Sequence, residues 1–272
     1  MSNLPAAPIS TIPADETSEM VQILRRILIT GASGAIGGAL ARRLAAPGTH
    51  LLLWGRDAVR LAAIAAECRA AGAVVALRQI DLADTASMLA AIAAEDAAAP
   101  IDSALLVAGQ GDTVAPGQIV EPAEQVARLA AVNFAGPAAL AAALATRMVE
   151  RGQGRILLVG SAAAFHALPH AATYAASKAG LARFAQALRL AVARHGVTIT
   201  LVSPGFIDWA GGGRPVPRIL LLPLDEAARR ILAAFAAGAG HAIIPRRFAL
   251  LRLLDRLLPG VARDALLRRL RP

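Results

Sequence analysis

The feature that most constrains the fold is a glycine-bearing turn between an apolar strand and a helix, close to the start of the sequence. Residues Arg26 to Thr30 have a strand pattern, the turn extends from Gly31 to Gly38, and a helical pattern continues to about Ala45. Gly31 can take a positive φ where the chain turns sharply. The N–H groups and the dipole at the helix start then attract a pyrophosphate. A tight turn without a ligand is the alternative, and the strand–turn–helix context favours the phosphate site.

Short apolar runs of strand length alternate with helical patterns along most of the chain. The further strands are expected at His50 to Gly55, Val74 to Ile80, Ser103 to Val107, Arg155 to Val159, Thr198 to Val202 and His241 to Ile244. The helices between them are expected at Asp57 to Ala71, Thr85 to Glu95, Pro122 to Met148, Tyr174 to Arg194 and Asp225 to Ala237. This alternation predicts a parallel sheet covered on both faces, a Rossmann-type doubly wound α/β fold in a single domain. In such a sheet a ligand binds beyond the carboxyl ends of the strands.

Composition excludes several classes of protein. The chain has 272 residues, of which 56 % are hydrophobic and 17 % charged, so it is not disordered throughout. No uncharged apolar run approaches the ~20 residues of a membrane span, which argues against an integral membrane protein. The single cysteine, Cys68, cannot form an internal disulfide and agrees with a reducing compartment, so we expect a cytoplasmic protein. The Ala-rich, Arg-for-Lys bias is typical of a GC-rich bacterial genome.

Three segments of the chain differ in character. Residues 1–22 lack periodicity and are expected to be a flexible leader, residues 23–245 form the domain, and residues 246–272 are a basic amphipathic tail. The net charge is +9, and the segment from Pro245 to Pro272 contributes +6 of it through eight Arg and two Asp. The rest of the chain is nearly neutral, which argues against a nucleic-acid-binding surface on the domain.

The tail has a pattern of its own. One broad helical face carries leucines, with three arginines among them: Leu250, Leu251, Leu254, Leu257 and Leu258, and Arg247, Arg252 and Arg256. Such a segment binds an anionic lipid surface, here the inner face of the membrane. Alternatively, it packs on a partner subunit or on the chain's own core, which is the commoner fate of such helices.

A Tyr–Lys pair is the strongest indication of catalysis. Tyr174 and Lys178 are the only tyrosine and the only lysine of the chain, and they lie four residues apart on one expected helix face. A lysine cation near a phenol lowers its pKa, so that the tyrosine can exchange a proton with an alcohol or carbonyl oxygen near neutral pH. Ser161 follows the fifth strand and can hydrogen-bond the same oxygen. A surface pair on an amphipathic helix is the alternative.

The end of the second strand bears on the choice of dinucleotide. An acid there favours the ribose 2′-hydroxyl of NAD, whereas a nearby Arg accommodates the 2′-phosphate of NADP. The chain has Gly55 followed by Arg56, so we expect NADP(H), with NAD(H) as the alternative. Arg56 would otherwise face solvent and pair with Asp57. Asp81, after the third strand, either hydrogen-bonds the adenine or caps the following turn.

Together these motifs resemble the classical short-chain dehydrogenase/reductase family over about residues 25 to 245. The matching residues, in order, are Thr30-Gly31-Ala32-Ser33-Gly34-Ala35-Ile36-Gly37, Asp81-Leu82, Asn133, Ser161, Tyr174-Ala175-Ala176-Ser177-Lys178 and Pro204-Gly205. Each motif is weak alone, but the ordered set is specific. The resemblance implies a hydride transfer between a nicotinamide cofactor and the carbon of an alcohol or ketone, in a homodimer or homotetramer that uses the long helices around Asn133 and Tyr174 as contact surfaces.

The resemblance also implies roles for individual residues. Tyr174 is the expected general acid/base, Ser161 orients and polarises the substrate oxygen, Lys178 holds the nicotinamide ribose, and Asn133 holds a water that links Lys178 to solvent. No metal ligand is expected. The expected cofactor-binding residues are Gly31, Ser33, Ala35, Ile36, Gly37, Arg56, Asp81, Leu82, Ala108, Gly109, Tyr174, Lys178, Pro204, Gly205 and Ile207.

Two departures from the family pattern leave another hypothesis open. Leu106-Val107-Ala108-Gly109 stands where the family usually has Asn-Asn-Ala-Gly, and Trp209 stands where the family often has Thr. The first departure removes amides that tie the central strands together. A non-catalytic dinucleotide sensor, or a membrane-associated scaffold on the same fold, is therefore the alternative to an enzyme.

The segments beyond the strands indicate the kind of substrate. Phe165, Leu168, Phe206 and Trp209 imply an apolar lining, so we expect a hydrophobic alcohol or ketone. His166 and His170 either contact the substrate or lie exposed on a loop. Gly211-Gly212-Gly213 would suit a lid, and a loop without that role is the alternative.

Overall fold

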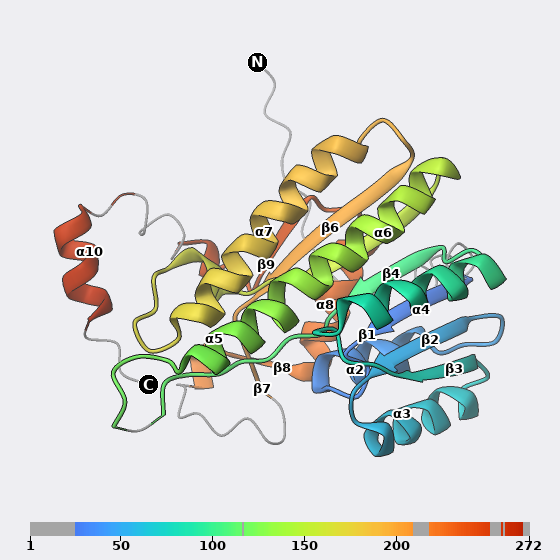
Figure 1. Ribbon diagram of the computed structural model, residues 1–272, viewed down its shortest axis with the longest axis horizontal. Helices are drawn as coiled ribbons and strands as arrows, with labels where there is room; N and C mark the ends of the chain where they lie inside the picture. The colour runs from blue at the N-terminus through green and yellow to red at the C-terminus, as the bar shows by residue number, and fades with distance from the viewer. Residues whose placement is uncertain (1–24, 116, 209–217, 251–256, 258, 269–272) are drawn as a thin grey trace.

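The computed structural model describes residues 25–115, 117–208, 218–250, 257 and 259–268. Its centre is a seven-stranded parallel sheet in the order β3-β2-β1-β4-β5-β6-β9 (Figure 1). The strands are β1 (Arg26–Thr30), β2 (His50–Gly55), β3 (Val74–Gln79), β4 (Ser103–Leu106), β5 (Gly154–Val159), β6 (Val197–Pro204) and β9 (His241–Ile244). The strand order reverses between β1 and β4. The predicted single-domain doubly wound α/β fold is therefore confirmed.

Helices cover both faces of the sheet (Figure 1). One face packs against α2 (Ala35–Leu44), α3 (Ala58–Ala70) and α8 (Leu224–Ala236), and the other against α4 (Thr85–Ala98), α6 (Gly136–Glu150) and α7 (Ala172–Val192). Side chains of a strand alternate between these layers, so Ile27 and Ile29 enter one core and Leu28 the other. The sheet is buried on both faces, which explains why its strands read as continuous apolar runs.

The helical stretch Ala123–Glu150 is long and apolar enough to cross a membrane by length and composition, and 56 % of the apolar segment that meets this criterion is buried. It consists of α5 (Ala123–Ala130), the π-helical turn η1 (Ala131–Ala135) and α6. Its α6 part buries Leu140, Leu144 and Met148 against the sheet. These contacts are those of a core helix.

Smaller elements lie beyond the carboxyl ends of the strands. The 3₁₀ turn η2 (Ala162–Phe165) follows β5, and the short strands β7 (Phe206–Asp208) and β8 (Leu221–Pro223) form a separate parallel pair, with the 3₁₀ turn η3 (Arg218–Leu220) before β8. Helix α10 (Gly260–Leu267) stands at one end of the molecule (Figure 1). The predicted leader, Trp209 and the glycine triplet at residues 211–213 lie outside the described residues.

Candidate active site

The turn after β1 is built around two glycines that admit no side chain. Gly31 has φ +68°, and a Cβ on it would lie 2.8 Å from the Cα of Ala108. A Cβ on Gly37 would overlap the main-chain oxygen of Gly31. These contacts let α2 begin directly against the turn and against the loop after β4. Both glycines are therefore required by the close packing of backbone on backbone around the turn.

The amino end of α2 is open. Gly34 is its N-cap residue, no side chain caps it, and its first turn carries no acid. The Gly34 N–H itself donates to the Gly31 carbonyl at 2.9 Å. The next N–H groups and the positive end of the helix dipole are thus available to an anion. Ile36 packs on the core beneath the turn, so it shapes the site from below.

The end of β2 is crowded by Ser33. A Cβ on Gly55 would lie 2.6 Å from Oγ of Ser33, so a side chain there would require the Ser33 hydroxyl to move. Asp57 is used locally, because its carboxylate accepts from the Arg60 backbone N–H at 3.0 Å and from Arg60 Nε at 2.6 Å. The alternative of an Arg56–Asp57 pair is therefore not what the structure has. Arg56 is exposed, and no salt bridge joins it to any residue that the structure describes.

Asp81 shapes the turn after β3. Its Oδ1 accepts the Ala83 backbone N–H at 3.0 Å, while the neighbouring Leu82 is buried. This is the turn-capping alternative of the sequence analysis. The carboxylate is exposed, so the contact with an adenine stays a prediction.

A buried threonine joins the ends of β1 and β4. The Thr30 hydroxyl accepts the backbone N–H groups of Val107 at 3.1 Å and of Ala108 at 3.3 Å. Thr30 is buried, so both hydrogen bonds are shielded from water. The departure at Leu106 and Val107 therefore leaves the ends of β1 and β4 joined.

Lys178 is buried at the base of the site. Only 3 % of its surface is exposed, and its Nζ donates to the Val159 carbonyl at 3.0 Å. Burial without a carboxylate partner among the described residues lowers its pKa from 10.5 to about 8. Tyr174, one turn earlier on α7, is only half-buried. The single helix thus holds a buried amine below a phenol that reaches the surface of the site.

Asn133 and Gly109 complete the surroundings of Lys178. A Cβ on Gly109 would lie 2.9 Å from Nζ of Lys178 and 3.2 Å from Oδ1 of Asn133. Asn133 is fully buried in η1, accepts the Gln110 N–H at 2.7 Å and donates to the Gln110 carbonyl at 2.9 Å and to Ser177 Oγ at 3.3 Å. Its side chain fastens the loop after β4 to α7. The water relay expected at Asn133 stays a prediction.

Ser161 and the Pro204-Gly205 segment lie at the ends of the next two strands. The Ser161 hydroxyl accepts the Ala163 N–H at 3.1 Å, which starts η2. Gly205 donates to the Ile244 carbonyl at 2.8 Å, and the ring of Phe248 lies directly over it. Ile207 follows in β7. Because all strands are parallel, these residues share the sheet edge with the turn after β1.

A further residue, Glu121, fastens the catalytic helix and was not predicted. Its Oε2 accepts both the backbone N–H of Thr173 at 2.8 Å and the Thr173 hydroxyl at 2.6 Å. Thr173 directly precedes Tyr174. The N-cap residue of α7 is Ala171, whose side chain makes no capping hydrogen bond. The contact joins residues 52 positions apart, so no local pattern could indicate it.

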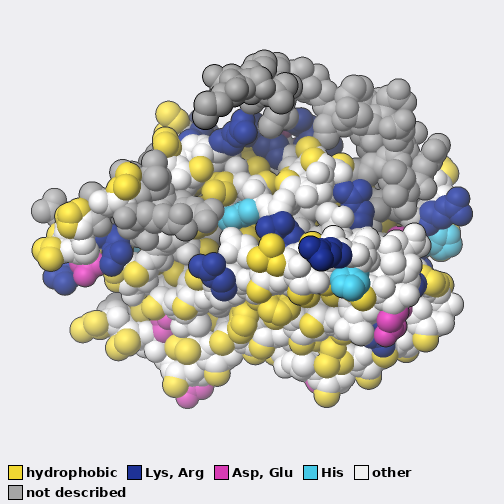
Figure 2. Space-filling view, turned by 90° about the horizontal axis from the view of Figure 1, so that it is seen from above, with side chains coloured by type: hydrophobic (Ala, Val, Ile, Leu, Met, Phe, Trp, Pro, Cys, Tyr) yellow, Lys and Arg dark blue, Asp and Glu magenta, His cyan; other side chains and the backbone are white. Residues whose placement is uncertain are grey.

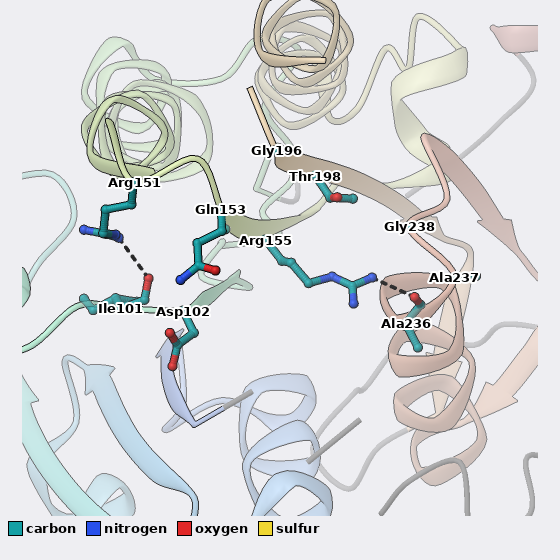
Figure 3. A pocket seen from close by; sticks show the side chains of 11 residues that line it. Ile101, Asp102, Arg151, Gln153, Arg155, Gly196, Thr198, Ala236, Ala237 and Gly238 are labelled. Atoms are coloured by element: carbon teal, nitrogen blue, oxygen red, sulfur yellow. Dashed lines mark hydrogen bonds between the residues drawn. The ribbon is translucent and has the colours of Figure 1, made fainter. Parts of the chain in front are cut away.

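A cavity of about 610 Å³ lies at the amino ends of the strands, opposite the candidate site (Figure 3). The polar groups that line it serve the fold. Arg155 donates to the carbonyls of Phe235 and Ala236 at 2.7 and 2.6 Å, and Arg151 donates to Ile101 at 3.2 Å. None of the predicted site residues lines this cavity, so the candidate site is the carboxyl edge.

Comparison with known proteins identifies the class. The family model for short chain dehydrogenase matches residues 25–214. The chain is 33 % identical to an uncharacterized oxidoreductase from Myxococcus xanthus over 251 residues, which cover 91 % of this chain and 98 % of that protein.

Two solved structures are similar over nearly their whole length. A short-chain dehydrogenase from Sphingobium yanoikuyae, in complex with NADPH, is 30 % identical with a TM-score of 0.74, covering 91 % of this chain and 97 % of that one. The bulky-bulky ketone specific alcohol dehydrogenase from Comamonas testosteroni is 27 % identical with a TM-score of 0.74, covering 91 % and 95 %.

The fold and the site thus define a dinucleotide-dependent oxidoreductase. The chain belongs to the short-chain dehydrogenase/reductase family and is an NAD(P)-dependent oxidoreductase of that family. Alcohols and ketones are the substrates typical of this family.

Proposed function

We propose that the protein is an NADP(H)-dependent oxidoreductase that interconverts a bulky apolar ketone and its alcohol. The observation that carries the cofactor preference is the exposed Arg56 at the end of β2, which forms no ion pair with a described residue. At the neighbouring Gly55, an acidic side chain would require the Ser33 hydroxyl to move. A ribose 2′-phosphate supplies the anion that Arg56 lacks. The NADPH complex of the Sphingobium relative supports this preference.

The side chains at the carboxyl edge then perform the proton transfer. The bound nicotinamide supplies or accepts the hydride. Tyr174 gives a proton to the substrate oxygen in reduction and takes it back in oxidation, and Ser161 donates a hydrogen bond to the same oxygen. With a pKa of about 8, Lys178 carries its positive charge near neutral pH. We propose that this charge favours the ionised phenol of Tyr174, one helical turn earlier. Asn133 holds the loop after β4 in place through Gln110, and Glu121 holds the start of α7 in place through Thr173.

The substrate class rests on the apolar side chains near the site. Phe165 and Phe206 follow β5 and β6, and Phe206 stacks edge-on against the buried Phe248 at 6.1 Å. A hydrophobic wall favours a substrate with apolar groups on both sides of the carbonyl. The specificity of the Comamonas relative for bulky-bulky ketones agrees with this class.

A fluorescence titration with NADPH and with NADH tests the cofactor preference. We expect NADPH to bind at least about tenfold more tightly, since a charge-assisted phosphate contact contributes roughly 1.5–3 kcal/mol. Arg56→Gln should remove this difference by weakening NADPH alone. Arg25→Gln, an exposed arginine at the opposite edge, is the matched control and should change neither affinity. Tighter binding of NADH by the unaltered protein would refute the preference.

Turnover of the Tyr174→Phe variant separates the enzyme from a non-catalytic sensor. We expect this variant to lose turnover of bulky ketones while it keeps its affinity for NADPH. If the unaltered protein binds NADPH but reduces no carbonyl compound in a broad screen, the sensor hypothesis replaces the enzyme. We also propose the dimer or tetramer usual in the family, which light scattering of the purified protein measures.

A further inference from the structure

Exposed apolar side chains are frequent in the segments that follow three strands of the sheet. The described residues include fourteen exposed large hydrophobic side chains, and eight of them belong to the loop between β4 and α5, to the segment between β6 and α8, and to the residues after β9. Seven of these eight are between 54 % and 92 % exposed. We call these seven the apolar rim: Ile119, Val120, Ile219, Leu250, Leu257, Val261 and Leu266. Apolar side chains concentrated in this way mark a surface that binds something.

Helix α10 contributes an amphipathic part of the rim. Val261, Ala262, Ala265 and Leu266 lie at helical spacing on one face and are all exposed, whereas Leu267, on another face, is buried. The single acid of this helix, Asp264, pairs with Arg263 at 3.5 Å. The apolar face of α10 is therefore turned to solvent while a different face holds the helix to the molecule.

Basic charge accompanies the apolar rim. Arg218, Arg246, Arg247 and Arg268 are exposed beside it, and the last 28 residues carry a net charge of +6. Figure 2 shows basic and hydrophobic side chains next to each other at the end of the molecule where α10 lies. The loop that carries Ile119 and Val120 lies toward the same end (Figure 1).

The tail is attached to the site itself. Phe248 is buried, its ring covers Gly205, and Arg247 stacks over that ring at 5.9 Å from its centroid. At the other side of the site, Glu121, which caps α7 through Thr173, directly follows Ile119 and Val120. Two parts of the apolar rim, at Leu250 and at Ile119 and Val120, thus lie close in sequence to residues that border the site.

We propose that the apolar rim binds the surface of an anionic lipid bilayer, with the opening of the active site toward the membrane. Exposed Leu, Ile and Val side chains among arginines are the composition of interfacial segments, which combine apolar insertion with attraction to anionic headgroups. A second copy of the chain fits less well, because two tails of +6 each repel one another. This membrane surface does not depend on the proposed reaction.

Sedimentation of the purified full chain with lipid vesicles tests the proposal. We expect binding to vesicles that contain phosphatidylglycerol, weak binding to phosphatidylcholine alone, and release by salt. Arg246→Gln with Arg268→Gln should weaken binding roughly thirtyfold, at about fivefold for each charge near the surface. Arg25→Gln with Arg194→Gln removes two exposed arginines elsewhere and should leave binding unchanged, apart from the small effect of net charge.

A second pair of variants tests the apolar contribution. Val261→Gln with Leu266→Gln should weaken vesicle binding at least about tenfold. The matched control, Val59→Gln with Leu190→Gln, changes equally exposed side chains on α3 and α7 and should bind as the unaltered protein does. NADPH affinity verifies that all variants are folded.

Three results would overturn the proposal. In the first, the unaltered protein does not sediment with anionic vesicles. In the second, the rim variants bind these vesicles as tightly as the unaltered protein does. In the third, no protein binds vesicles, but the Val261→Gln with Leu266→Gln variant has a lower oligomer mass than the unaltered protein. The last result would assign the rim to a second copy of the chain. Since vesicle binding requires no turnover, it stands or falls separately from the proposed function.

Discussion

Replacing Lys178 by methionine should make the protein more stable while it abolishes turnover. The side chain is 3 % exposed, and its pKa falls from 10.5 to about 8 because burial disfavours the ammonium. At 1.36 kcal/mol for each pKa unit, the charged lysine costs the cofactor-free protein about 3 kcal/mol at neutral pH. Methionine fills a similar volume without a charge, and the lost hydrogen bond to Val159 offsets about 1 kcal/mol of the gain. The net expectation is about 2 kcal/mol at pH 7.

The sign of the pH dependence follows from the direction of the shift. Because the folded-state pKa lies below that of the unfolded chain, the unfolded chain binds more protons between pH 8 and 10.5. The penalty is therefore complete below about pH 8, decreases as the pH rises, and is absent above about pH 10.5. The advantage of the Lys178→Met variant should decrease over the same interval.

Urea denaturation of both proteins at a series of pH values measures this difference. An increase of about 2 kcal/mol corresponds to a rise in melting temperature of roughly 4–8 °C for a domain of this size. Arg183→Met, an exposed site on the same helix, is the control and should change the free energy of unfolding by less than about 0.5 kcal/mol. A Lys178→Met variant less stable than the unaltered protein at pH 7, or a difference that does not vary with pH, would refute the reasoning.

Three further substitutions test the supports of the site. Gly37→Ala places a methyl group on the Gly31 carbonyl and should cost about 1–3 kcal/mol of stability and weaken NADPH binding, as titration and melting curves would reveal. Glu121→Ala should lower kcat roughly tenfold or more with little change in the KM for NADPH, because it removes the hydrogen bonds to Thr173 that hold the start of the catalytic helix; an unchanged kcat would contradict this role. Phe248→Ala should cost about 3–5 kcal/mol, and a loss below about 1 kcal/mol in urea would show that the base of the tail is not part of the core.

Elements defined by local chemistry were predictable from the sequence. The strands β1, β2 and β9 have the predicted bounds, because each is a short apolar run between turn signals. Asp57 caps α3 at the predicted start of this helix, since an N-cap contact spans only three residues. The turn after β1 was predictable for the same reason.

Features that depend on distant partners were not predictable. The π-helical turn η1 lies around Asn133, whose side chain bonds Gln110, 23 residues away. Glu121 caps a helix that begins far along the chain, and Phe248 belongs to the core although its neighbours read as a continuous amphipathic segment. In each case a tertiary contact decides the structure, and single-sequence periodicity carries no information about it.

The position of β1 in the middle of the sheet has a consequence for synthesis of the protein. Strand β1 leaves the ribosome before both of its neighbours in the sheet, β2 on one side and β4 on the other, and its Thr30 hydroxyl accepts a hydrogen bond from a residue 77 positions later. At ~5–20 residues per second, β1 waits roughly 4–15 s for that partner to emerge. During this time one edge of an apolar strand is unpaired, and nonlocal parallel pairing of this kind is slow. The nascent chain therefore passes through an interval in which an apolar strand edge is open to non-native pairing, well before the active site forms.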